Sequence, residues 1–161
     1  MTNPQNGDKP LGIGIEINRY AKEAYDAGHP IEAVTILHTA TEFIMNGVLR
    51  IYFGKLVKNI KITYFDYKTV ARILFGLGLI STNEFGQLKK FNTERNRLVH
   101  NIFKEYVRQK DAKTAYEVGD KVLLVMANRG VELMRSETLK EIEKDVSGKL
   151  TSLLTSLVDK N

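Results

Sequence analysis

The chain has 161 residues, of which 43% are hydrophobic, and a formal net charge of +5. These values are ordinary for one globular domain with its own core, and the lack of cysteine excludes disulfides, thiol nucleophiles and thiolate metal sites. No run of about 18 apolar residues could span a membrane, and the first ten residues lack the apolar segment of a signal peptide, so a cytoplasmic protein is expected.

Residues 1–10 are polar and contain two prolines, so we expect them to be disordered and the single domain to cover residues 11–161. Apolar residues at helical spacing predict a first helix that ends at Gly28, and Pro30 is suited to open the next one. Residues 12–17 also alternate like a strand and could pair with residues 59–64. This small hairpin is the less favoured alternative.

A second helix is predicted over about residues 30–53, where apolar residues recur at three- and four-residue steps: Ala33, Leu37, Ala40, Ile44, Val48 and Ile51. His38 lies beside this row, and Glu42 is its only carboxylate neighbour at i+4. A packed histidine is therefore expected and no metal site. Glu42 is a candidate supporting residue, because a carboxylate on a helix often holds a basic partner in place.

Capping signals place the next two helices. Asp66 is suited to cap a third helix over about residues 67–77, and Ser81 with Glu84 forms a capping box for a fourth. The fourth helix is predicted from Thr82 to about Gln109. Its apolar residues form one stripe that should face the core: Phe85, Leu88, Phe91, Leu98, Ile102 and Tyr106.

Asp111 is suited to start a fifth helix and Ser136 a sixth. The last segment, about residues 137–158, has a seam close to a heptad pattern and should pack on its own bundle or on a second subunit. The predicted fold is therefore all-α, an up-and-down bundle of about five to six helices.

The fourth helix also carries polar residues where apolar ones are expected. Arg95 falls on the apolar stripe, and a guanidinium in that register is costly to desolvate unless an anion compensates it. His100 lies on a neighbouring row with Asn96. These three residues are the candidate site.

Positive charge is concentrated around the same helix. Residues 89–113 contain eight basic and three acidic residues, a local charge of +5, so the rest of the chain is neutral. Such a stripe is typical of a surface that binds phosphates, and the candidate RNA-binding residues are Arg97, Lys104, Arg108 and Lys113. A solvated lysine-rich face is the alternative explanation.

The run from Arg95 to His100, Arg-Asn-Arg-Leu-Val-His, is an R-x4-H motif with a polar residue after the arginine, and it resembles the HEPN superfamily. The resemblance covers roughly residues 30–135. It implies a compact helical bundle, usually a dimer, with the two motifs facing each other across the interface. Many HEPN proteins are metal-independent endoribonucleases of toxin, defence or RNA-processing type, whereas others are non-catalytic modules that bind RNA, a nucleotide or a partner protein.

Endoribonuclease chemistry fits the motif without a cofactor. Imidazole can take the 2′-OH proton or protonate the leaving oxygen, while arginine offers a fork to phosphate oxygens, so cleavage would leave a 2′,3′-cyclic phosphate. His100 and Arg95 suit these roles, and Asn96 suits orientation of the imidazole or binding of a phosphate oxygen. Because acid–base work favours two groups and each motif has one histidine, a homodimer with a composite site is expected.

One departure from the family pattern concerns partners. HEPN toxins with nucleotidyltransferase antitoxins often continue as R-x4-H-x-Tyr, and here Ile102 occupies that position, with Tyr106 the nearest tyrosine. An antitoxin or regulatory protein is thus a family-implied partner without that modification site. A further alternative is a helical domain in which Arg95 only pairs with a core carboxylate such as Glu42.

Overall fold

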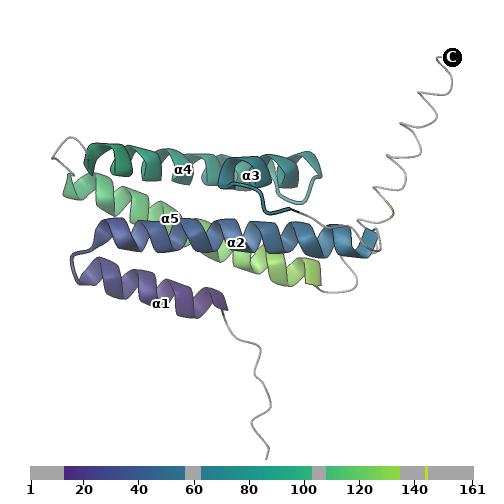
Figure 1. Cartoon of the computed structure of the whole chain (residues 1–161), viewed down its shortest axis with the longest axis horizontal. Coiled ribbons are helices and arrows are strands. Elements are labelled where there is room, and N and C mark those ends of the chain that lie inside the picture. Colours follow the sequence, from purple (N-terminus) through teal and green to yellow (C-terminus); the bar gives the residue numbers. More distant parts are fainter. Residues whose placement is uncertain (1–12, 57–62, 103–107, 135–143, 145–161) are drawn as a thin grey trace, which may run out of the picture.

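The computed structural model describes residues 13–56, 63–102, 108–134 and 144, and within these residues it is all-α, as predicted, with no strand. Figure 1 shows the long helices side by side in a bundle, with a short helix, α3, next to α4. The described helices are α1 (Ile13–Asp26), α2 (Pro30–Leu56), α3 (Tyr67–Gly76), α4 (Thr82–Ile102) and α5 (Gln109–Met134).

Helix α2 is the centre of the bundle, because it packs against each of the other four helices. Its predicted apolar row faces the core: Ala33, Leu37, Ala40 and Val48 are buried, and Ile44 is half-buried. A helix that is apolar over much of its circumference is expected at such a position. Helix α2 therefore lies against all the other described helices.

The turn from α1 to α2 is built by a glycine. Gly28 has a φ of +85°, a left-handed conformation that suits a residue without Cβ, and the His29 N–H donates to the Ala24 carbonyl at 2.9 Å. Because residues 13–17 begin α1, the alternative hairpin is wrong for this stretch. A helix is favoured over a strand there because helical spacing brings Ala21, which is fully buried, onto the core face.

The predicted caps of α3 and α4 are confirmed. The Asp66 carboxylate accepts the N–H groups of Lys68 and Thr69 at 3.0 and 3.1 Å. In the capping box, the Ser81 N–H donates to Glu84 at 2.6 Å and the Glu84 N–H donates to the Ser81 hydroxyl at 3.2 Å. Both helix starts are therefore fixed by side chains that are local in sequence.

The core face of α4 is also as predicted, since Leu88, Phe91 and Leu98 are buried. Phe91 lies so close to α5 that a Cβ on Gly119 would come within 2.5 Å of its ring, so only glycine allows this approach. The predicted end at Gln109 is wrong, because Gln109 opens α5. The Arg108 carbonyl accepts the N–H groups of Asp111 and Ala112 and starts the new helix there.

Several predictions lie outside the described residues. They are the disordered residues 1–10, the second strand of the hairpin at 59–62, Lys104 and Tyr106, and nearly all of the predicted sixth helix at about 137–158. Among the described helices, none combines the length and the apolar character that a membrane crossing requires.

Candidate functional site

Arg95 is a half-buried cation in the second half of α4. Its Nη1 donates to the neutral Asn96 Oδ1 at 3.0 Å, while its Nε is buried and has no hydrogen-bond partner. In the described part of the chain, the ion pairs of α4 and α5 use Arg97, Lys113 and Arg129, and none uses Arg95. Among these residues, the guanidinium is thus partly desolvated without an anionic partner, which is a costly state.

Asn96 and His100 lie on one row of α4, four residues apart. Asn96 is half-buried, and His100 is exposed in the last turn of the helix. Asn92 precedes Asn96 by four residues, so these three polar side chains lie along one line of the helix. At 1.5 Å per residue the line is about 12 Å long. Asn92, Asn96 and His100 therefore lie along one edge of α4, and Arg95 is joined to this edge by its bond to Asn96.

A histidine from α2 lies beside this edge. The His38 ring stacks on Tyr67, with ring centroids 4.2 Å apart, and its Nε2 is 3.3 Å from Asn92 Oδ1. Burial lowers the pKa of His38, and the charge of Arg95 lowers it further, although Asn92 and Glu42 act in the opposite direction. The imidazole is therefore packed and neutral at pH 7, in agreement with the packed histidine expected from the sequence.

Glu42 supports the start of α3. Its Oε2 accepts the Tyr67 N–H at 3.0 Å, and one turn later Asn46 exchanges two hydrogen bonds with the Phe65 backbone, both at 2.9 Å. Asn46 is 2% exposed, so these bonds are well shielded from water. The carboxylate of Glu42 is used in this way and forms no ion pair with Arg95. Its observed contact is with the first residue of α3, and the predicted contact with a basic partner is not formed with Arg95.

The four candidate RNA-binding residues differ in their surroundings. Arg97 pairs with Glu94 at 2.6 Å and Asp111 at 3.1 Å, linking α4 to α5. Lys113 pairs with Glu117 at 3.8 Å, and both are exposed. Arg108 is exposed just before α5, and Lys104 lies outside the described residues. Arg97 is therefore largely neutralised within the fold, whereas Arg108 and Lys113 remain open to a ligand.

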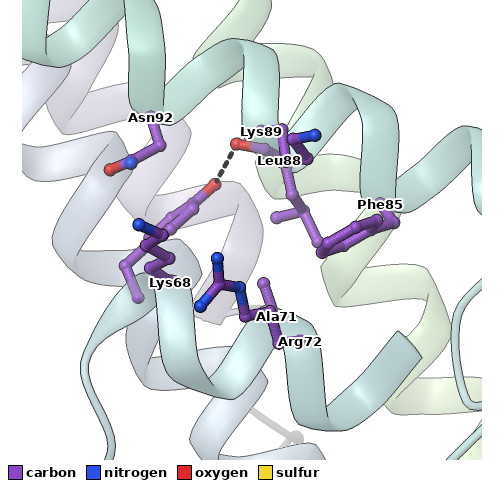
Figure 2. Close-up of a pocket in the computed structure, with 8 residues that line it drawn as sticks. Lys68, Ala71, Arg72, Phe85, Leu88, Lys89 and Asn92 are labelled. Carbon is purple, nitrogen blue, oxygen red and sulfur yellow. Dashed lines mark hydrogen bonds between the residues drawn. The ribbon is translucent and has the colours of Figure 1, made fainter. Parts of the chain in front are cut away.

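A pocket of about 240 Å³ opens between α3 and α4, as Figure 2 shows. This pocket is not among the features predicted from the sequence. A signal was present, because Lys68 and Arg72 share one face of α3 without an acidic residue at a helical spacing of three or four. The lining residues are Tyr67, Lys68, Ala71, Arg72, Phe85, Leu88, Lys89 and Asn92.

Comparisons of the chain with protein-family models, with curated proteins and with solved structures find no match. Among the described residues, no three histidine, aspartate or glutamate side chains are grouped as they would be to hold a metal ion.

Proposed function

We propose that the protein is a metal-independent endoribonuclease of HEPN type that acts as a homodimer. The observation that carries the proposal is the half-buried Arg95, whose charge has no carboxylate partner among the described residues and whose Nε has no acceptor. A phosphate supplies the missing anion and accepts two parallel N–H bonds from one guanidinium. The row of Asn96 and His100 beside it provides the polar groups that phosphoryl transfer needs.

The roles follow from the chemistry of each side chain. Arg95 stabilises the charge that develops on the phosphate oxygens, and Asn96, whose Oδ1 is bonded to Arg95, holds the guanidinium in position. His100 is exposed, so a substrate reaches its ring, and imidazole exchanges protons near neutral pH. The 2′-oxygen attacks phosphorus as its proton leaves, and the departing 5′-oxygen receives a proton, which yields a 2′,3′-cyclic phosphate.

Cleavage by acid–base catalysis is favoured by two proton-transferring groups, but each copy of the motif has one histidine. A two-fold interface repeats every residue, so two copies of His100 would face one phosphate. His100 lies in the last turn of α4, away from the core, and this location is compatible with such an interface. Sedimentation should show a dimer at micromolar concentration, and a fully active monomer would contradict the composite site.

The direct test of the function is incubation of the purified protein with mixed RNA in EDTA. We expect fragments that end in 2′,3′-cyclic phosphate, with none formed by His100→Ala. Cleavage that requires an added metal ion, or that is equal in His100→Ala, would contradict the proposal. A toxin, defence or RNA-processing role, with or without a regulatory partner protein, belongs to the same proposal.

A non-catalytic module that binds RNA or a nucleotide is the second candidate. It is favoured by the cationic pocket between α3 and α4, which does not include His100. This candidate predicts RNA binding without any cleavage, and His100→Ala would then leave all measured properties unchanged.

A further inference from the structure

The pocket between α3 and α4 is positively charged and has an apolar floor. Lys68 and Arg72 approach from α3 and Lys89 from α4, and none of the lining residues is acidic. In Figure 2 the Arg72 guanidinium extends from α3 into the space towards α4. The volume of about 240 Å³ is far more than one water molecule needs. The pocket therefore has the size and the charge to hold an anionic group.

The three cations have no counter-ion among the residues that the structure describes. No ion pair in the described part of the chain involves Lys68, Arg72 or Lys89, and the Lys89 ammonium instead lies 5.8 Å from the centre of the Phe85 ring. Lys68 and Arg72 are four residues apart on one helix, an arrangement in which like charges repel. By contrast, Arg97 and Arg129 each meet carboxylates. An anion in the pocket would relieve this repulsion.

Asn92 links the pocket to the candidate site. Its Oδ1 faces His38, which leaves the amide nitrogen as a donor, and it stands three residues before Arg95 on α4. That separation is about 4.5 Å along the helix axis. The Tyr67 hydroxyl is already used, because it donates to the Leu88 carbonyl at 3.4 Å. The free donors of the pocket are thus three cations and one amide.

We propose that this pocket binds a phosphate group, through Lys68, Arg72 and Lys89 with the Asn92 amide, and that the phosphate belongs to an RNA strand that also passes Arg95. Lysine and arginine donors around one cavity match the several acceptor oxygens of a phosphate. Binding at the pocket needs no chemistry at His100. The inference goes beyond the proposed function, and either one can fail alone.

The test uses a fluorescent single-stranded oligonucleotide with 2′-O-methyl groups, which keeps the phosphates and lacks the attacking hydroxyl. Its affinity is measured by anisotropy over a range of salt concentrations, and adenosine monophosphate is measured as a competitor. The test variant is Arg72→Gln/Lys89→Gln. The control is Arg50→Gln/Lys121→Gln, which removes the same charge from two exposed residues that do not line the pocket. Thermal melts verify that both variants are folded.

We expect the pocket variant to lose roughly tenfold or more in affinity, as loss of charge-assisted hydrogen bonds predicts. Its salt dependence should flatten by about 0.7 log unit per lost contact, and the control should keep the wild-type slope. A different supporting result is that adenosine monophosphate competes with the oligonucleotide for the wild type and not for the pocket variant. That result would also support the phosphate site, and the phosphate would then come from a free nucleotide. Equal losses in both variants, or none in either, would overturn the proposal, even if the protein cleaves RNA.

Discussion

Two half-buried arginines on facing helices show how differently one residue type is used. Arg129 of α5 binds both carboxylate oxygens of Glu84 with Nη2, at 3.0 and 3.1 Å, and donates from Nη1 to Glu132 at 2.9 Å. Arg95 of α4 donates only to the neutral Asn96 in the described part of the chain. Both guanidinium groups have a buried Nε without a hydrogen-bond partner, but only that of Arg129 meets carboxylates among the described residues.

The partner of Arg129, Glu84, stabilises the start of α4. Glu84 closes the capping box with Ser81 and at the same time joins α4 to α5 through Arg129. Burial acts to raise the pKa of Glu84, but the Ser81 hydrogen bonds and the Arg129 guanidinium together hold this pKa below its usual value. The start of α4 is thereby fixed against α5.

The largest expected effect is on catalysis at Arg95. Arg95→Leu should lower RNA cleavage by on the order of 10²–10³, because it removes the donor that stabilises transition-state charge. Cleavage of a defined RNA is measured in EDTA, beside Arg129→Leu as the matched arginine control. Equal losses in the two variants would contradict the assignment of Arg95 to the site.

Arg129→Leu should act on stability instead. It breaks a bidentate pair and leaves Glu84, whose side chain is 14% exposed, without its counter-ion, so we expect a loss of about 1–3 kcal/mol. Urea unfolding at pH 7 measures this loss. Glu132→Gln, which removes only an exposed i,i+3 partner, is the control and should change little. If the two variants are equally stable, Glu84 contributes nothing across the helices.

Low pH should weaken the contact between Glu84 at the start of α4 and Arg129 of α5. A carboxylate with a lowered pKa stabilises the fold above its unfolded pKa of about 4.3, and this contribution is lost as the pH falls through the lower folded value. The unfolding free energy of the wild type should therefore fall below pH 4.3 more steeply than that of Arg129→Leu. Parallel pH profiles would show that Arg129 does not hold the pKa of Glu84 down.

The smallest effect concerns His38, whose pKa is lowered by burial first and by the charge of Arg95 as well. Arg95→Leu should shift its titration upward, towards the ordinary value of about 6.5, whereas Arg129→Leu should not. The shift is measured from the His38 ring signals by NMR. An unchanged titration would mean that Arg95 points away from His38.

Sequence reasoning succeeded where the determining contacts are local. The Asp66 cap, the Ser81–Glu84 box and the buried stripe of Leu88, Phe91 and Leu98 depend on spacings within one helix or its first turn. The same periodicity identified Arg95 as out of place among apolar residues, and the structure shows it half-buried.

Contacts between helices were not predictable in this way. The ion pair between Arg97 and Asp111 joins α4 to α5, and the hydrogen bond of His38 joins α2 to Asn92 of α4. The basic run at residues 89–113 made Arg97 a candidate for RNA binding. Its partner Asp111 lies beyond the end of α4, where no spacing rule applies. The pocket escaped notice for the same reason, since packing of α3 on α4 creates it.

The central claim is that Arg95 serves a ligand and not the fold, and the unfolding free energy of Arg95→Leu tests it most directly. Because the substitution removes a partly desolvated charge without an ionic partner, we expect stability to be unchanged or raised by up to ~2 kcal/mol. Breaking a buried ion pair would instead cost about 3–5 kcal/mol. A loss of that size in urea unfolding at pH 7 would contradict the account.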